Sequence, residues 1–349
     1  MRVKVSILGH FGEGVNLLNG QTVKTKIITE ELQNQLGQDQ VLKIDTHGGW
    51  KTLLKAPFQV FRAFKNSTNV LIFPAHNGLR VYAPLLSLAR LFFKKRKIYY
   101  VVIGGWLPQF LMRRKCLSVI LRQFDGIFVE TNTMKSALGA QGFENVYVMP
   151  NCKKLTVLSE NELVYPLGVP YKLCTFSRVM REKGIEDAVN AVMSVNTDLG
   201  VQAFSLDIYG QVDGAQIEWF ESLQTKFPSY IRYGGVVPFD KSVDVLKDYF
   251  ALLFPTYYEG EGFAGTLIDA YSAGVPVIAS DWKYNAELVN DNVGFVYPTG
   301  DQLAFMDILK AMAVDPTLLL CKKRLCLIEA DKYKIDKAVQ ILIEQIEGD

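Results

Sequence analysis

The stretch FALLFPTYYEGEGFAGTLIDAYSAGVPVIASD, residues 250–281, decides the fold of this chain. It opens with an apolar run, passes through a glycine-rich loop into a helical pattern, and closes with a second apolar run. Two neighbouring parallel strands need a crossover connection, which is usually a helix. The stretch therefore predicts one strand–helix–strand unit of a parallel α/β sheet.

The same alternation of apolar runs and helical patterns extends toward both ends of the chain. Between residues 153 and 170 the periodicity is lost, and Pro166, Gly168 and Pro170 indicate a linker. A chain of 349 residues also exceeds what one hydrophobic core usually serves. We therefore expect an α/β fold of two doubly wound, Rossmann-like domains that face a central cleft, at residues 1–155 and 165–329. A C-terminal helix at about residues 330–349 is expected to pack back on the first domain.

Composition excludes several classes of protein. An apolar content of 49% with 21% charged residues excludes a disordered chain. The five cysteines are scattered without a CxxC pair, and no DxD motif is evident, so we expect no disulfide framework, no metal and no cofactor. The first residues lack the apolar core of a signal peptide, and the longest apolar stretches are too short to cross a bilayer. These observations favour a cytoplasmic protein.

Charge is distributed unevenly along the chain. Residues 1–155 carry 22 Lys/Arg against 8 Asp/Glu, whereas residues 156–349 carry 16 against 28. Residues 46–124 contain 14 Lys/Arg and no acid, which predicts an anionic partner: nucleic acid, a lipid surface or a phosphorylated substrate. The run Lys94, Lys95, Arg96, Lys97 follows the apolar segment LLSLARLFF, which favours peripheral binding to an anionic membrane. No nucleic-acid motif accompanies the charge, so nucleic acid is not expected.

The glycine-rich loop after residue 256 carries the strongest site signal. Glu259 and Glu261 precede a run that leads into the helix, and Asp269 lies one turn inside it. Free N–H groups at a helix start can bind phosphate, and carboxylates can bind sugar hydroxyls. The segment therefore predicts a sugar-nucleotide site, whereas helix capping alone accounts for only one of the carboxylates.

Two further segments predict phosphate contacts. Arg178 comes just after the strand-like run KLCTFS, and Lys183 precedes the next helical pattern, a pairing that suits a diphosphate. Near the N-terminus, the loop Asn19-Gly20-Gln21-Thr22 opens a helix whose free N–H groups can hold a phosphate. The alternatives are solvated surface cations for the first segment and an ordinary Asn-Gly turn for the second.

In order and spacing, these motifs resemble those of bacterial glycosyltransferases of family 4, which are retaining enzymes with the GT-B fold. The resemblance covers nearly the whole chain, and its character is that of exopolysaccharide or capsule assembly enzymes. It rests on SRVMREKG, DIYGQ, YGGVV, EGEGFAGTLIDAYSAGVPVIASD, NGQTVKT, IFVETNTMKSAL and VYVMPN.

The resemblance implies a role for each motif residue. Arg178 and Lys183 would hold the donor diphosphate, Glu261 would contact the donor sugar, and Asp269 would bind the ribose hydroxyls. The loop at Gly20 and Gln21 would close over the diphosphate. The backbone that would bind sugar and phosphate runs through Gly262, Phe263, Ala264, Gly265 and Thr266.

Two departures from the family pattern affect the expected site. Asp269 stands where the family usually has glutamate, so its shorter arm reaches the ribose differently. Gly104, Gly105 and Trp106 occupy the place where a histidine often lies near the reacting carbon. His76, after another strand, is the nearest substitute, and it joins Trp106 as a candidate on the acceptor side; a structural histidine is the alternative.

These features predict a hexosyltransferase that moves a sugar from a nucleotide-diphosphate sugar, preferably a UDP-sugar, to a lipid-linked or soluble saccharide acceptor. Retention is favoured because only Glu13 and His76 are plausible general bases in the acceptor domain. We expect the protein on the inner face of the cell membrane, in polysaccharide synthesis. A non-catalytic GT-B partner subunit and a nucleotide-sugar epimerase are the alternative functions.

Overall fold

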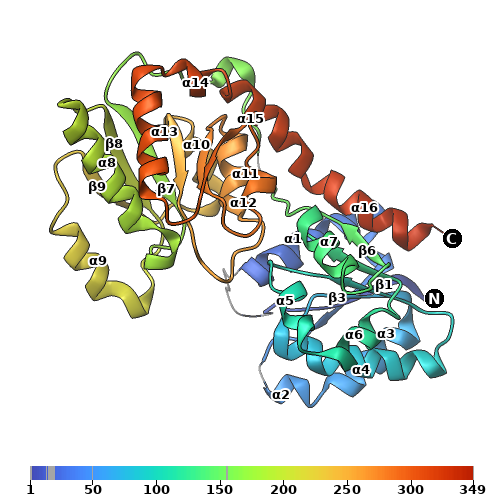
Figure 1. Cartoon of the computed structure of the whole chain (residues 1–349). Coiled ribbons are helices and arrows are strands. Elements are labelled where there is room, and N and C mark those ends of the chain that lie inside the picture. Colours follow the sequence, from blue (N-terminus) through green and yellow to red (C-terminus); the bar gives the residue numbers. More distant parts are fainter. Residues whose placement is uncertain (1, 13, 15–19, 49, 155, 349) are drawn as a thin grey trace. The chain divides into compact units, whose positions relative to one another are not determined.

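The computed structural model describes residues 2–12, 14, 20–48, 50–154 and 156–348. The chain divides into an N-terminal unit, residues 1–154 with 334–349, and a C-terminal unit, residues 155–333. Each unit contains one parallel six-stranded sheet with helices on its faces (Figure 1). The predicted α/β class with two doubly wound sheets is therefore confirmed.

The sheet of the N-terminal unit has the strand order β2-β1-β3-β4-β5-β6. The chain moves outward from β1 to β2 and then returns to the other side of β1, so the winding direction reverses between β1 and β3. The strands are β1 (Val3–Gly9), β2 (Val41–Asp45), β3 (Ser67–Ile72), β4 (Lys97–Val101), β5 (Gly126–Val129) and β6 (Val146–Val148).

Helices cover both faces of this sheet. Val5 and Ile7 of β1 point into a core on one face, while Ser6 between them points the other way and its hydroxyl donates to the Ala63 carbonyl oxygen at 3.5 Å. This alternation follows from the two-residue period of a strand. The helices are α1 (Gly20–Leu36), α2 (Trp50–Leu53), α3 (Ala56–Asn66), α4 (His76–Phe92), α5 (Leu107–Met112), α6 (Lys115–Leu121), α7 (Asn132–Gly139) and α16 (Ile335–Glu347).

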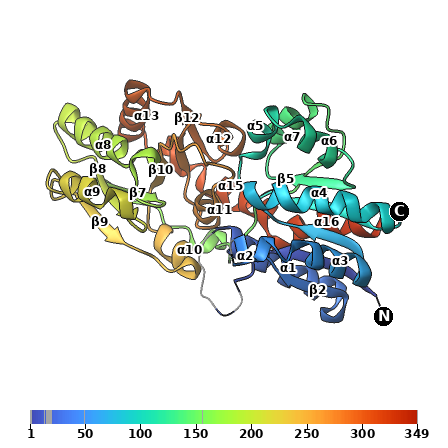
Figure 2. The same ribbon diagram turned by 90° about the horizontal axis from the view of Figure 1, so that it is seen from below.

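The last of these helices, α16, comes from the C-terminal end of the chain and lies against α1 (Figures 1 and 2). Leu342 and Val339 are buried in the same core as β1. The Tyr99 hydroxyl donates to the Gln345 carbonyl oxygen at 2.5 Å, and Lys4 pairs with Glu347 at 2.7 Å. The N-terminal unit is thus built from two stretches of sequence that lie far apart.

The sheet of the C-terminal unit has the order β12-β11-β10-β7-β8-β9. The chain adds β8 and β9 on one side of β7 and then crosses to add β10, β11 and β12 on the other, so the reversal falls between β7 and β10. The strands are β7 (Tyr171–Phe176), β8 (Phe204–Tyr209), β9 (Ile231–Gly235), β10 (Ala251–Phe254), β11 (Val277–Ser280) and β12 (Gly294–Tyr297).

Two hydrophobic cores lie on the opposite faces of this second sheet. Leu173 belongs to one core and Cys174 to the other, and Leu252 and Leu253 alternate in the same way. Helices α8 and α13 pack side by side on one face, and α11 and α15 on the other (Figure 1). The helices are α8 (Ile185–Leu199), α9 (Ile217–Gln224), α10 (Ser242–Leu246), α11 (Gly265–Ser272), α12 (Asn285–Leu288), α13 (Gln302–Val314), α14 (Thr317–Leu320) and α15 (Lys323–Ala330).

The predicted basic run at residues 94–97 needs a correction. Arg96 is buried, and its Nε donates to the Phe64 carbonyl oxygen at 3.1 Å, while Lys97 Nζ donates to the Gly348 carbonyl oxygen at 3.0 Å. Within this run of four, only Lys94 and Lys95 are exposed, because Arg96 and Lys97 bond to backbone carbonyl oxygens. Within the part of the chain that the structure describes, no helix combines the length and apolar character needed to cross a bilayer.

Replacing Leu342 by Ala in α16 should destabilise the N-terminal unit. The lost side chain leaves a cavity against β1 and α1, and such a change typically costs about 2–5 kcal/mol in free energy of unfolding. Hydrogen exchange followed by mass spectrometry should show faster exchange of the β1 and β3 amides. Gln340→Ala, on the exposed side of the same helix, is the matched control. Unchanged exchange in Leu342→Ala would mean that α16 does not support this core.

Candidate functional site

The clearest candidate site lies where the winding of the second sheet reverses. In open α/β sheets, ligands bind outside the carboxyl ends of the strands at such a reversal. The loop after β7 carries Arg178 and a 3₁₀ turn, Arg181–Lys183, and the loop after β10 carries Thr256 and Glu261. The strand order alone therefore places these two loops beside each other, because β7 and β10 are neighbours.

Glycines let the loops at this edge approach closely. Gly184, with φ of +69°, follows the 3₁₀ turn, and a Cβ atom there would lie 2.1 Å from the Pro255 carbonyl oxygen. Gly210, with φ of +135°, follows β8, and its Cβ atom would lie 1.8 Å from the Ser177 carbonyl oxygen. Any other residue at either position forces the loops apart.

A buried ion pair joins two of the predicted site residues. Lys183 Nζ lies 2.5 Å from Glu261 Oε2, and the two side chains are 12% and 7% exposed. The Thr256 hydroxyl donates to the same carboxylate oxygen at 2.9 Å. Lys183 Nζ also lies 5.1 Å from the centre of the Tyr258 ring. The structure thus brings Lys183 and Glu261 together, 78 residues apart in sequence.

Hydrogen bonds from the end of β11 and from the residues just after it hold the glycine-rich loop in place. Trp282 Nε1 donates to the Tyr258 carbonyl oxygen at 2.7 Å, and the Ser280 hydroxyl donates to that of Thr256 at 2.5 Å. Glu259 points outward, with 73% of its side chain exposed, and pairs with Lys283 at 3.0 Å. Of the two glutamates noted in the sequence, only Glu261 is buried.

Helix α11 begins at this loop with its first N–H groups uncapped by a side chain. The Thr266 hydroxyl in the first turn is buried, and it lacks a hydrogen-bond partner among the described residues. A buried orphan hydroxyl beside a helix start is a fitting arrangement for an anionic or hydroxyl-bearing ligand. Asp269, one turn further, is also buried. Of the other predicted residues, Gly262 and Ala264 lie in the loop just before α11, and Gly265 is the first residue of the helix.

The Phe263 side chain is buried, and its ring packs edge-on against Tyr333 at 4.8 Å between ring centres. Phe263 therefore anchors the loop to the core and leaves only its backbone for a ligand.

Arg178 lies on the same edge but contacts a different residue. Its Nη1 is 3.6 Å from Asp213 Oδ2, and 61% of its side chain is exposed. Asp213 also accepts from the Ala215 backbone N–H at 3.0 Å, so it is held in place independently. An exposed pair of this length contributes little to stability, which leaves the guanidinium group able to turn toward an anion.

The predicted residues Gly20 and Gln21 lie in the first turn of α1. The Gln21 side-chain amide donates to the Phe73 carbonyl oxygen at 3.1 Å, which ties the start of α1 to the end of β3. A Cβ atom at Gly20 would meet nothing within 4 Å, so packing does not require glycine there. Asn19 and the candidate base Glu13 lie outside the described residues.

The two acceptor-side candidates stack on each other. The rings of His76 and Trp106 lie 3.9 Å apart between centres, and Phe110 is 5.0 Å from His76. Burial, followed by the charges of Arg80 and Arg114, lowers the pKa of His76 from its usual value. The imidazole is therefore neutral at pH 7, with a nitrogen free to accept a proton or hydrogen bond.

Two further histidines, His10 and His47, also lie next to each other. His10 Nδ1 lies 2.7 Å from the Thr22 hydroxyl, and His47 Nδ1 lies 2.9 Å from His10 Nε2. Burial, followed by His47, lowers the pKa of His10, and Asp45 opposes that shift. Each histidine follows one of the adjacent strands β1 and β2, and that placement was the only signal in the sequence. Among the described residues, no group of three His, Cys, Asp or Glu side chains is placed to hold a metal ion.

Part of this chain is similar to a known protein family and to known proteins. Residues 170–315 match the family described as "Glycosyl transferases group 1". The UDP-N-acetylglucosamine–peptide N-acetylglucosaminyltransferase GtfA subunit of Streptococcus agalactiae is 30% identical over 170 residues, which cover 47% of this chain and 32% of that protein. The chain thus spans about a third of the length of this curated relative.

Two solved structures share the fold over nearly their whole length. The lipopolysaccharide outer core galactosyltransferase WaaB superposes with a TM-score of 0.72 at 15% identity, covering 98% of both chains. Anabaena HepE in complex with UDP and glucose superposes with a TM-score of 0.71 at 14% identity, covering 98% of this chain and 99% of that one. The fold is therefore GT-B, and the C-terminal unit carries a glycosyltransferase group 1 domain.

Lys183→Met should destabilise the C-terminal unit more than the double variant Lys183→Met/Glu261→Gln. The single change leaves the buried Glu261 carboxylate without its cation, which typically costs about 3–5 kcal/mol, whereas the double change removes both charges. Urea unfolding of the variants measures the difference. Equal stability of the two variants would contradict an essential pairing.

Proposed function

We propose that this chain, with its glycosyltransferase group 1 domain, transfers a hexose from a UDP-sugar to a saccharide acceptor with retention of anomeric configuration. We place it in family 4 and in the synthesis of a cell-surface polysaccharide of the capsule or exopolysaccharide type. The protein would act at the cytoplasmic face of the membrane.

The observation that carries the proposal is the set of groups gathered at the β7–β10 edge. A guanidinium group, a lysine–glutamate pair and an uncapped helix start with an orphan hydroxyl lie on adjacent loops. Cations and free N–H groups suit a diphosphate, while carboxylates suit sugar hydroxyls. Within this set Arg178 and the first turn of α11 would bind the phosphates, and Glu261 would bind the sugar.

UDP is the proposed nucleotide because UDP appears in the names of related proteins. The name of the curated relative contains UDP-N-acetylglucosamine, and the structure of HepE was solved in complex with UDP and glucose. Asp269, buried in α11, would accept hydrogen bonds from the ribose hydroxyls.

In the proposed reaction, the bond between the anomeric carbon and the diphosphate oxygen breaks as the acceptor oxygen attacks from the same face. The departing diphosphate oxygen takes the acceptor proton, so no protein base is required. The negative charge that develops on the diphosphate is stabilised by the charge of Arg178 and by the start of α11. Lys183 adds positive charge to this edge and forms the ion pair with the buried Glu261 carboxylate.

The proposed acceptor is a lipid-linked saccharide, with a soluble saccharide as the less favoured form. His76 and Trp106 form an aromatic surface of the kind that stacks on sugar rings, and the neutral His76 can orient a hydroxyl group. A peptide acceptor is the second candidate, because the curated relative carries the word "peptide" in its name. That relative is also named as a subunit, so a partner role for this chain is retained as an outcome of the test below.

Membrane binding is proposed through a surface formed by the neighbouring helices α3 and α4. Large apolar side chains are exposed on it, among them Phe58 at 69% and Phe92 at 80%. We call this the α3–α4 surface; its exposed members are Phe58, Phe61, Leu88, Leu91 and Phe92, with the cations Lys55, Arg62, Lys65, Lys94 and Lys95. Apolar and cationic groups together suit the headgroup region of an anionic bilayer.

Incubation with a panel of radiolabelled UDP-sugars and saccharide acceptors tests the proposed activity. We expect a labelled product whose anomeric configuration, measured by NMR, is that of the donor. An isomerised nucleotide sugar would indicate an epimerase, and no turnover would favour the partner role.

Arg178→Ala should weaken the binding free energy of UDP, measured by calorimetry, by about 1.5–3 kcal/mol, which is the usual contribution of charge-assisted hydrogen bonds. Arg324→Ala is the matched control, because Arg324 is also an exposed arginine with one carboxylate partner. Equal UDP affinity in both variants would refute the assigned donor site.

Sedimentation with lipid vesicles tests the α3–α4 surface. The wild type should sediment with vesicles that contain phosphatidylglycerol but not with neutral vesicles, and less in high salt because exposed charges are screened. Lys94→Gln/Lys95→Gln should weaken binding about thirtyfold, since each cation near an anionic surface contributes about 1 kcal/mol. Lys135→Gln/Lys226→Gln removes the same charge from other exposed positions and should bind like the wild type. Equal sedimentation with neutral and anionic vesicles would disprove the electrostatic part of the proposal.

A further inference from the structure

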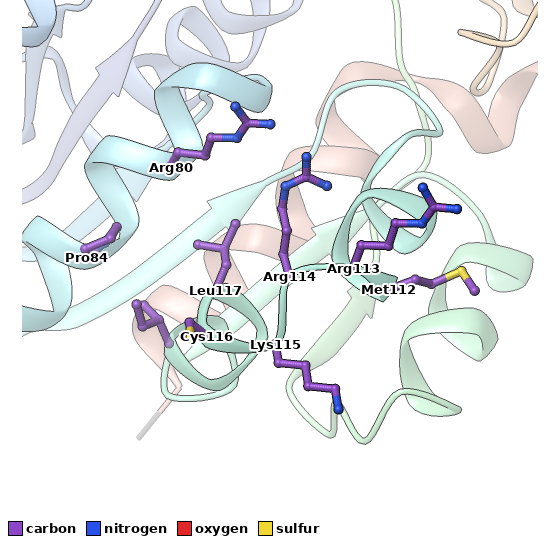
Figure 3. Close-up of a pocket in the computed structure, with 9 residues that line it drawn as sticks. Arg80, Pro84, Met112, Arg113, Arg114, Lys115, Cys116 and Leu117 are labelled. Carbon is purple, nitrogen blue, oxygen red and sulfur yellow. The ribbon is translucent and has the colours of Figure 1, made fainter.

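A pocket of about 560 Å³ opens in the N-terminal unit, and its lining includes none of the α3–α4 cations discussed above (Figure 3). It is formed by the first half of α4, the end of α5 with the segment that follows it, and helix α6. Its lining residues are Arg80, Pro84, Met112, Arg113, Arg114, Lys115, Cys116, Leu117 and Ile120.

The pocket carries an uncompensated positive charge. Arg80, Arg113 and Arg114 extend their guanidinium groups to the same side of the view in Figure 3, while Lys115 extends the opposite way. In the described parts of the chain no carboxylate forms an ion pair with these cations, and residues 46–124 supply no acid at all. Like charges gathered without a counterion repel one another, so their proximity indicates an anionic ligand.

The Arg114 side chain is held in position before any ligand arrives. Its Nη1 donates to the Phe110 carbonyl oxygen at 2.8 Å, and its guanidinium carbon lies 3.8 Å from the centre of the Phe110 ring. Arg80 approaches the same ring, at 5.3 Å. Both cations are therefore placed by one aromatic side chain, which reduces the entropy lost when they bind an anion.

The other wall of the pocket is apolar and aliphatic. Met112 is 69% exposed, although it is a large apolar side chain, and Pro84, Leu117 and Ile120 also line the pocket. A free inorganic anion would leave this wall in water. A ligand with an anionic group and an aliphatic chain would cover both halves of the pocket.

The same phenylalanine ring connects the pocket to the acceptor-side candidates. Phe110 lies 5.0 Å from the His76 ring and 5.1 Å from the Trp106 ring, between centres. A ligand phosphate near Arg114 would therefore lie one aromatic ring away from His76. That spacing suits a molecule that carries a phosphate next to a sugar.

We infer that this pocket binds a phosphorylated amphiphile, with its phosphate or diphosphate on Arg80, Arg113 and Arg114 and its aliphatic chain along Met112, Leu117 and Ile120. The inference rests on the proposed function in one respect: it makes the ligand the lipid-diphosphate part of the saccharide acceptor. Single-stranded nucleic acid fits less well, because its bases stack on open aromatic side chains and this wall is aliphatic.

Calorimetric titration of the full chain with farnesyl diphosphate tests the inference, with inorganic pyrophosphate and farnesol as probes of the two halves. Farnesyl diphosphate should bind more tightly than either probe. Arg80→Gln and Arg113→Gln should each weaken its binding about tenfold or more, which corresponds to about 1.4 kcal/mol. Lys135→Gln removes an exposed cation outside the pocket and should have no effect on this binding.

Met112→Ser tests the apolar wall, and it should weaken the binding of farnesyl diphosphate but not that of pyrophosphate. Val119 is exposed on α6 outside the pocket lining, so Val119→Ser should change the binding of neither probe.

Any one of three results would overturn the inference as a whole, and a fourth would overturn its amphiphile part. The three are no binding of farnesyl diphosphate, equal binding in the arginine variants and the wild type, or tighter binding of a ten-nucleotide RNA through the same arginines. If pyrophosphate bound as tightly as farnesyl diphosphate, the aliphatic chain would contribute nothing to binding, and the ligand would not be an amphiphile. UDP titration of the same samples shows whether the C-terminal unit is intact, so failure of this pocket and failure of the donor site are distinguished.

Discussion

The buried carboxylate of Glu261 is the constraint on which the ligand edge of the C-terminal unit depends. A carboxylate that is almost excluded from water must be paired, and Lys183 supplies the partner from the far side of the β7–β10 reversal. Gly184, the residue after Lys183, lets the 3₁₀ turn lie directly against Pro255. The Glu261 carboxylate therefore joins the loop after β7, through Lys183, to the residue Thr256 just after β10.

Much of this architecture follows from local pattern. The alternation of apolar runs with helical segments predicts two parallel sheets, and the position of Arg178 and Lys183 after one strand predicts a cationic edge. Direct pairing of Lys183 with Glu261 was beyond the sequence, because it depends on which strands become neighbours. The burial of Arg96 could not be predicted either, because a run of four cations normally indicates a solvated surface. In the structure, Arg96 is buried and bonds to the Phe64 carbonyl oxygen.

Aromatic rings organise the candidate residues of the N-terminal unit. His76 and Arg80 of α4, together with Trp106 and Arg114 from the segments beside α5, each contact Phe110. In the sequence, His76 is a candidate because it follows a strand, and Trp106 because it occupies the family's usual histidine segment, but nothing there selects Phe110. An apolar residue in an apolar helix carries no visible signal of this kind, and only the folded chain shows that its ring is shared by an imidazole and two guanidinium groups.

The return of α16 to the N-terminal unit determines the order in which the protein becomes complete during synthesis. The C-terminal unit is one continuous stretch, so all of its residues have left the ribosome before residues 335–347 emerge. N-terminal domains usually fold first during synthesis. Here the N-terminal unit can add its last helix, α16, only after the whole C-terminal unit has been synthesised. Until that helix arrives, the core face of β1 and α1 is uncovered, and a nascent chain is exposed to premature association at that face.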